Sequence, residues 1–240
     1  MTFLKFPAWR SITAMLSLAL CLCMFNACSG DDDDEDDITL TADTSADDTS
    51  DDEETTSSDI TYVNGYAAVD LGLSVKWATC NIGADSPEDY GNYYAWGETE
   101  TKDEYTSSNS VTYGVEMSNI SGKTKYDAAT ANWGDSWRMT THDEMSELIN
   151  SCTWRLKYEN GVKGYLVTGS NGNSIFLPAT GYRDGTSRYE AGSTGNYWSS
   201  TPVTSGRNKT AWYLFFSSSG LTGAGDTRYF GYTVRPVSDY

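Results

Sequence analysis

The clearest indication of the fold lies in residues 164–177, which read GYLVTGSNGNSIFL. Two runs rich in β-branched and aromatic residues, 164–168 and 174–177, flank the turn-forming segment 170–173. Asn-Gly between such runs is the strongest short-range signal for a β-hairpin, because both central positions of the turn must tolerate positive φ. We therefore expect an antiparallel hairpin here.

Other short runs of the same kind predict further strands. They cover residues 67–71, 75–79, 93–96, 197–200, 211–216 and 229–237. In 212–216, which reads WYLFF, both faces are apolar, and this pattern predicts a central strand that is covered on two sides.

One helix is well indicated after Thr141. This residue forms a capping box with Glu144, and Met145, Leu148, Ile149 and Cys152 follow at the spacing of a buried helical stripe. A second helix is expected over residues 125–131. Two helices among many short antiparallel strands predict an α+β domain, with long ordered loops rich in Gly, Ser, Thr and Asn.

The globular domain is expected to be residues 60–240. This region holds all 17 tyrosines and seven of the eight tryptophans of the chain, and its 181 residues are enough for a single domain with a proper core. It carries 19 acids and 14 bases, a net charge of −5. With no basic patch or stripe, the composition argues against nucleic acid as a partner.

The first segment, 1–27, has the layout of a secretory signal: Lys5 and Arg10 precede an apolar run over residues 12–25. A membrane-spanning helix is the alternative, but it needs about 20 apolar residues. Cys28, between Ala27 and Ser29, resembles the acylated cysteine of a bacterial lipobox, which implies a lipoprotein anchored to the outer membrane through acyl chains. Phe25 and Asn26 depart from the commonest lipobox, so ordinary cleavage stays open.

Residues 28–59 are expected to form a disordered acidic tether. From Ser29 to Asp59 there are 15 acids and no Lys or Arg, and such a segment buries too little apolar surface to offset its ordering entropy. A calcium loop is the alternative, but counted from Asp31 it would place Asp36 and Ala42 where Gly and Glu are needed. The run resembles the surface-export signal of Bacteroidetes lipoproteins, which implies exposure at the cell surface.

Six motifs in order along the domain resemble one family, the Fibrobacter succinogenes major paralogous domain of Bacteroidetes lipoproteins. They are residues 69–84 (VDLGLSVKWATCNIGA), 93–99 (YYAWGET), 133–139 (WGDSWRM), 173–179 (NSIFLPA), 195–200 (GNYWSS) and 234–237 (VRPV). The motif at 133–139 is followed by Thr140 where the family would have Pro. The resemblance implies a C-type-lectin-like fold, shared with formylglycine-generating enzymes, in which two helices pack against two small antiparallel sheets.

The residues that catalysis would need are scarce, and we predict that the domain is not an enzyme. Its single histidine, His142, lies in the capping turn of the expected helix, so a His-based triad or zinc site would have to be built around it alone. The resemblance to formylglycine-generating enzymes does not extend to their cysteine pair near the chain end, and the calcium-binding tripeptides of sugar-binding lectins do not occur. No cofactor or metal is expected.

Two cysteines remain in the domain, Cys80 and Cys152, and neither belongs to a Cys-x-x-Cys motif. Cys152 falls on the core stripe of its helix. It is therefore either a buried thiol or half of a disulfide with Cys80, which export through the periplasm would permit.

A group of aromatic and polar residues is the candidate ligand site. Aromatic rings beside hydrogen-bonding groups suit sugar faces and peptide anchors. The residues are Tyr182, Arg183, Asp184, Arg188, Tyr189, Glu190 and Trp198. The alternative is that Trp198 fills the core and that Arg235 pairs with an internal acid.

The leading hypothesis for function is a surface-displayed binding or adhesion module for a glycan or a protein of a host or partner. The alternative is a structural or accessory component of a cell-envelope assembly that binds no small ligand. A hydrolase with paired carboxylates would need two acids about 5–10 Å apart in a cleft, and no two acids can be recognised as such a pair from the sequence.

Overall fold

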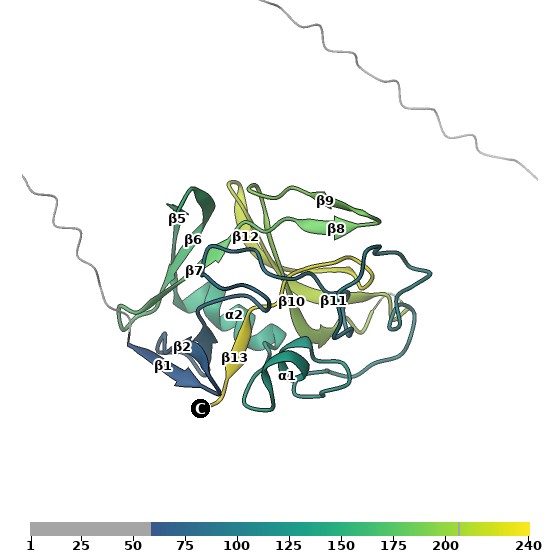
Figure 1. Cartoon of the computed structure of the whole chain (residues 1–240), viewed down its shortest axis with the longest axis horizontal. Helices are drawn as coiled ribbons and strands as arrows, with labels where there is room; N and C mark the ends of the chain where they lie inside the picture. The colour runs from purple at the N-terminus through teal and green to yellow at the C-terminus, as the bar shows by residue number, and fades with distance from the viewer. Residues whose placement is uncertain (1–58, 206) are drawn as a thin grey trace, which may run out of the picture. The chain divides into compact units, whose positions relative to one another are not determined.

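The structure is a computed structural model, and it describes residues 59–205 and 207–240 (Figure 1). The expected signal segment, Cys28 and the tether up to residue 58 lie outside these residues. Within the described part the architecture is α+β, as predicted: four small antiparallel sheets and two short helices. Neither of these helices is long and apolar enough to cross a membrane.

The largest sheet joins the first and last strands of the described chain. Its order is β1 (Ile60–Val63), β2 (Tyr66–Val69), β3 (Lys76–Ala78), β13 (Pro236–Ser238) and β4 (Arg138–Met139). The terminal strand β13 lies between β3 and β4, where Val237 pairs with Trp77 on one side and with Arg138 on the other. The end of the chain is therefore built into the sheet, and cannot be removed without opening it.

Two three-stranded sheets and a hairpin complete the β structure. The strands of the sheets are β5 (Thr153–Glu159), β6 (Val162–Thr168) and β7 (Ser174–Pro178) in one, and β10 (Gly195–Pro202), β11 (Thr210–Ser217) and β12 (Gly220–Thr227) in the other. The hairpin consists of β8 (Tyr182–Asp184) and β9 (Ser187–Tyr189). The predicted hairpin at 164–177 is confirmed as β6–β7, but its loop spans residues 169–173 and, of these, only Gly172 has positive φ.

Both predicted helices are present. Helix α2 (His142–Ser151) begins after Thr141, whose hydroxyl accepts from Glu144 N (3.2 Å) while the Glu144 carboxylate accepts from Thr141 N (2.8 Å). Helix α1 (Ala128–Trp133) begins three residues later than expected, because Asp127 takes an extended conformation and caps it. The Asp127 carboxylate also accepts from Met139 N, which ties α1 to β4.

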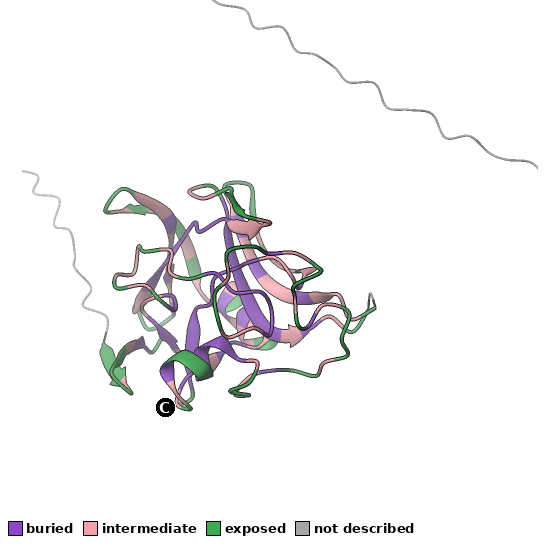
Figure 2. Cartoon of the chain, turned by 45° about the vertical axis from the view of Figure 1, so that its right-hand side comes forward, coloured by how far each residue is buried: buried purple, intermediate pink, exposed green. Residues whose placement is uncertain are grey.

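Two large clusters of buried side chains form the core, and a small third one joins Tyr93, Ala95 and Tyr105. One large cluster lies around α1 and includes five rings that are almost fully buried, Tyr94, Trp96, Trp137, Trp198 and Tyr232. The other packs α2 against β6, β7, β10 and β11, with Leu148 and Leu214 among its members. Figure 2 shows buried residues along β10 and through the centre of the domain, with exposed residues at the hairpin tips and outer loops.

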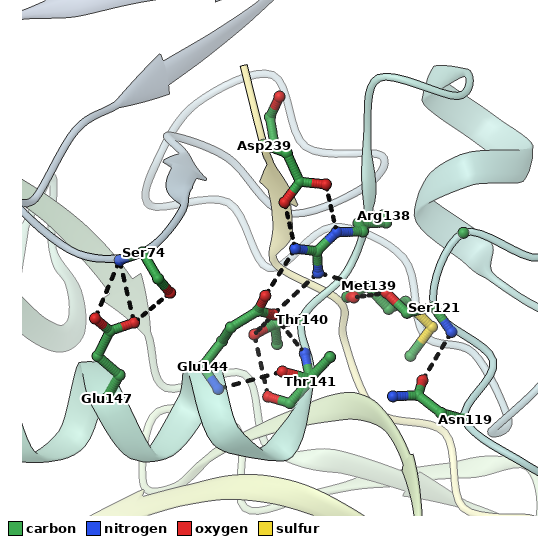
Figure 3. Close-up of polar contacts among 12 residues, drawn as sticks. Ser74, Asn119, Ser121, Arg138, Met139, Thr140, Thr141, Glu144, Glu147 and Asp239 are labelled. Carbon is green, nitrogen blue, oxygen red and sulfur yellow. Dashed lines mark hydrogen bonds and ion pairs between the residues drawn. The ribbon is translucent and has the colours of Figure 1, made fainter.

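An ion network fastens the C-terminal end to α2 (Figure 3). Arg138 donates to both carboxylate oxygens of Glu144 (2.7 and 3.0 Å) and to the carboxylate of Asp239. Burial opposes ionisation of Glu144, but hydrogen bonds from Arg138 and Thr141 outweigh it and lower the pKa of Glu144. The bond from Arg138 likewise lowers the pKa of Asp239.

Two predicted strands, 93–96 and 229–237, are wrong for most of their length. Tyr94 and Tyr232 exchange backbone hydrogen bonds in an isolated bridge, and only the end of the second segment becomes β13. The neighbouring amide of Trp96 donates instead to Arg228 O (2.8 Å). Because the backbone partners of these segments come from several different loops, no ladder propagates along them.

The strand at 211–216 is confirmed as β11, the middle strand of its sheet. Leu214 and Phe216 are buried, whereas Trp212, Tyr213 and Phe215 are half-buried, so the second face is only partly covered. Its neighbour β12 was not predicted, because its three glycines have a low strand propensity. Pairing with β11 along all eight residues stabilises β12 instead.

Candidate functional site

The β8–β9 hairpin presents most of the residues that the sequence selected. A two-residue loop joins its strands, with Gly185 at a φ of 55°. The hairpin is fixed to the domain at two points: Arg183 exchanges backbone hydrogen bonds with Gly231 (2.8 and 2.9 Å), and Gly185 does so with Tyr105 (2.8 and 2.9 Å). Its side chains are thus held by backbone contacts rather than by a free loop.

A row of five rings extends from this hairpin across the neighbouring loops. Successive ring centroids lie 5.0–5.5 Å apart, within the range of favourable aromatic contacts. In order the rings are Tyr113, Tyr229, Phe230, Tyr182 and Tyr189. We call these five residues the aromatic face. Four of the rings are half-buried, and Tyr189 at one end is 46% exposed.

A second layer of rings lies beneath the aromatic face. Tyr232 contacts Tyr182 and Phe230, and on its other side it stacks on Trp198 with centroids 4.3 Å apart. Trp198 is 0% exposed, and its indole N–H donates to Tyr94 O (2.9 Å). The prediction that Trp198 contacts ligand is therefore wrong: it belongs to the core that supports the face.

Carboxylates surround the aromatic face. Partial burial raises the pKa of Tyr182, and the negative charges of Glu190 and Asp184 raise it further. Burial also raises the pKa of Tyr229, again with Asp184 as a contributor. Asp226 accepts a hydrogen bond from the Tyr232 hydroxyl (2.6 Å). Among the described residues, none of these three acids forms an ion pair.

The cations near the hairpin lie over other rings. The Arg183 guanidinium lies 5.4 Å from the centroid of Tyr93, and that of Arg188 lies 5.3 Å from the centroid of Tyr90. Of the polar residues predicted for the site, Asp184 and Glu190 therefore adjoin the aromatic face, while both arginines point to neighbouring tyrosines. The sequence did not predict Tyr113, Tyr229, Phe230 or Asp226, because they come from segments far from 182–190.

A pocket of about 470 Å³ is lined by none of the residues of the aromatic face, and its residues were not predicted as a site. Its wall comes mainly from residues 97–102, with Val111, Lys125 and Tyr126. Lys102 Nζ pairs with Glu98 (2.8 Å) and also donates to Asn109, so both charges are already satisfied within the protein. The size is typical of a ligand pocket, but the charged groups available to a ligand are few.

Two arginines, Arg228 and Arg235, are fully buried and have no acidic partner among the described residues. Arg235 donates to Asn81 Oδ1 (2.8 Å) and to the carbonyl oxygens of Ala78, Thr79 and Phe176 (2.7–3.0 Å). The expected internal acid is thus replaced by an amide and three carbonyls, and burial lowers the pKa of Arg235. Arg228 lies 4.3 Å from the Trp96 ring centroid, and burial lowers its pKa to about 10.

Of the two states left open for the cysteines, the structure has the free thiols. Cys80 follows β3 and its Sγ lies 3.6 Å from Thr79 Oγ1, whereas Cys152 caps α2 and packs against the core cluster there. The two thiols thus have different neighbours. The His142 ring lies against that of Trp212, with centroids 4.2 Å apart and planes tilted by 39°. The described residues contain no group of three His, Cys, Asp or Glu placed to hold a metal ion.

One family matches part of the chain: a domain of unknown function, DUF8237, matches residues 154–237. The match covers about a third of the sequence. It runs from within β5 to within β13 and includes every residue of the aromatic face except Tyr113. Neither a curated protein nor a solved structure matches the chain.

Proposed function

We propose that this protein is a binding module displayed on the cell surface, and that the aromatic face is its contact surface. The observation that carries this function is the row of five rings held at the surface at separations of 5.0–5.5 Å. The part of each ring that faces solvent gains little from packing, whereas it supplies rigid contact area to a ligand at low entropic cost. The ligand is a glycan or a protein.

The rigidity of the β8–β9 hairpin favours a preformed binding surface rather than a loop that becomes ordered when the ligand binds. The hairpin carrying Tyr182 and Tyr189 is tied to Gly231 and Tyr105 by four backbone hydrogen bonds, and the buried Tyr232 supports its inner ring. A prearranged surface loses less conformational entropy when it binds. No reaction is part of this function, and no cofactor takes part in it.

The finer features of the proposal come from the sequence. The acylated Cys28 and acidic tether would anchor the domain to the outer membrane and hold it away from the bilayer, and the motif resemblance favours a C-type-lectin-like fold. Incorporation of labelled acyl chains, lost in Cys28→Ala, and cleavage of the domain by protease added to intact cells test this arrangement. Absence of the label together with full protection from protease would contradict it.

The contact surface is tested separately on glycan arrays and with immobilised host proteins. The wild-type chain should give signals that Tyr182→Leu/Tyr189→Leu loses, and unfolded chain sets the background. Tyr158→Leu is the matched control, because this tyrosine is exposed on β5 and lies outside the aromatic face. Signals that survive the double substitution would place the contact surface elsewhere.

A structural role in an envelope assembly is the second candidate, and exposed apolar side chains on two edge strands favour it. Tyr62 on β1 is 74% exposed and Tyr158 on β5 is 64% exposed, and each strand is the outer strand of its sheet. Edge strands with exposed apolar side chains offer both backbone and side-chain contacts to another protein. Cross-linking on intact cells through Tyr62 or Tyr158, to one defined partner, would favour this role.

A further inference from the structure

Acids outnumber bases around the aromatic face, where Lys209 lies over Tyr113 at one end. Asp184 lies on β8 two residues after Tyr182, Glu190 follows Tyr189, and Asp226 accepts from the hydroxyl of Tyr232 beneath the face. None of the three acids forms an ion pair within residues 59–205 and 207–240. The nearby guanidinium groups of Arg183 and Arg188 are placed over Tyr93 and Tyr90 instead. In the described part of the chain these three carboxylates are thus left without a basic partner, beside the exposed Tyr189 and three half-buried rings.

Carboxylates beside aromatic rings favour a positively charged ligand. The face of an aromatic ring carries the negative part of its quadrupole and attracts ammonium and guanidinium groups. Adjacent carboxylates strengthen that attraction, and they repel phosphate, sulfate and carboxylate groups. The chain provides its own example at one end of the row, where Lys209 Nζ lies 5.0 Å from the centroid of Tyr113.

Of the remaining four rings, Tyr189 is exposed and the other three are half-buried. Within the described residues, no cation lies over Tyr182, Tyr189, Tyr229 or Phe230. We propose that the aromatic face binds a basic segment of a protein, with Lys or Arg side chains seated on these rings and paired with Asp184, Glu190 and Asp226. This inference rests on the proposed function, and it specifies the ligand of the same surface.

A protein segment fits better than a single amine. One ammonium covers one ring, whereas the row presents several rings in succession, so a chain that repeats its positive charges gains at each step. Asp226 lies on β12, which is the outer strand of its sheet. An extended segment that reaches Asp226 therefore meets an edge strand able to pair with its backbone.

The test uses the full chain and a capped peptide with alternating Lys and Gly. The acidic tether would attract this peptide without specificity, but residues 29–58 contain no aromatic residue. Ring currents provide a signal that the tether cannot produce: the Lys ε-methylene protons of the peptide should shift upfield in its NMR spectrum. Affinity should also fall as salt is raised, because exposed charges are screened.

Two variants separate the contributions of rings and charges. Tyr182→Leu/Tyr189→Leu should abolish most of the ring-current shift, and Asp184→Asn/Glu190→Gln should weaken binding by about two- to fivefold for each charge removed. Asp226 is left intact because the Tyr232 hydroxyl donates to it. Asp85→Asn/Asp135→Asn changes the net charge equally at exposed positions and should change the affinity less than twofold.

Three further probes decide between outcomes. A peptide with Glu in place of Lys should not bind, and oligomers of glucosamine and of N-acetylglucosamine should bind more weakly than the Lys peptide. Equal binding of the neutral sugar, lost in the tyrosine variant but kept in the acid variant, would overturn the cationic ligand and leave the binding surface in place. Binding of the Lys peptide without any upfield shift, unchanged in both variants, would remove the aromatic face from both proposals.

Discussion

Two stacked ring pairs in this domain have similar geometry and opposite surroundings. Trp198 and Tyr232 lie with centroids 4.3 Å and planes 25° apart, and both are buried. Tyr182 and Tyr189 lie 5.5 Å and 27° apart, yet 46% of Tyr189 is exposed. Ring geometry alone therefore does not tell a core from a recognition surface. Burial does, because only the first pair has been removed from water.

The acids show the same contrast. Glu144 lies between Arg138 and the start of α2, and its carboxylate accepts hydrogen bonds from the Arg138 guanidinium and from Thr141 N. Asp184 and Glu190 adjoin the aromatic face and have no basic partner among the described residues. Removing Glu144 should thus cost stability, whereas removing the other two should cost binding.

The largest effect is expected from the buried pair. Trp198→Ala leaves a cavity beneath the aromatic face and removes one of the two hydrogen bonds to Tyr94 O, and should lower the free energy of unfolding by about 3–5 kcal/mol. Urea unfolding followed by circular dichroism measures this loss. A change below about 1 kcal/mol would mean that Trp198 is not part of the core.

The next largest effect is expected at alkaline pH, which should destabilise the folded protein through the half-buried Tyr213 and the buried Tyr232. Burial and the charge of Asp226 raise the pKa of Tyr213 to about 12, and they also raise that of Tyr232. The unfolded chain loses these protons near the ordinary value of 10, so the stabilisation is complete below pH 10 and is lost above it. For Tyr213 the loss is on the order of 2 kcal/mol by pH 12.

Urea midpoints measured from pH 8 to pH 12, with tyrosinate absorbance of the folded state, check this pH dependence. Tyr213→Phe should lessen the slope above pH 10, because it removes one of the shifted groups. Folded protein that ionises all its tyrosines together near pH 10 would contradict the buried layer.

A smaller effect is expected in the ion network. Glu144→Gln keeps the size of the side chain but removes the charge that Arg138 contacts, and should lower the free energy of unfolding by roughly 1–2 kcal/mol. Asp239→Asn is the matched control. Its carboxylate contacts the same guanidinium but is 61% exposed, so the loss should be under about 1 kcal/mol. Equal losses would show that burial does not govern this network.

The smallest effect on stability is expected at the aromatic face itself. Tyr189→Ala and Asp184→Asn should each change the free energy of unfolding by about 0.5 kcal/mol or less, because these side chains make few buried contacts. Thermal unfolding of each variant provides the measurement. A large loss at Tyr189 would indicate that the exposed pair is a structural element, and the comparison with Trp198 and Tyr232 would fail.

Local signals predicted the local elements well. The capping box at Thr141 and Glu144 placed α2, and the Asn-Gly turn placed the β6–β7 hairpin, because neighbours in sequence create both features. The same reasoning failed for 229–237, where the backbone hydrogen bonds go to residues 82, 94, 183, 196 and 198 in several separate segments. It also missed the glycine-rich β12, which depends on pairing with β11.

Part of the candidate site could be predicted from the sequence. Residues 182–190 were selected because aromatic and polar residues cluster there, and the structure does bring Tyr182, Tyr189 and Asp184 to one surface. Trp198 was selected on the same grounds and is buried instead. Side-chain type does not reveal exposure where half-buried and buried rings occur in the same segments.

The amino-acid sequence by itself determined that an aromatic-rich α+β domain follows an acidic segment, and where its first strong helix and hairpin lie. Those features depend on composition and on neighbours within a few residues. Only the tertiary structure decided which rings face water, which acids have no basic partner among the described residues and which arginines are buried among carbonyls. These properties arise when distant loops meet, and the depth at which each side chain then lies in the domain sets its solvation.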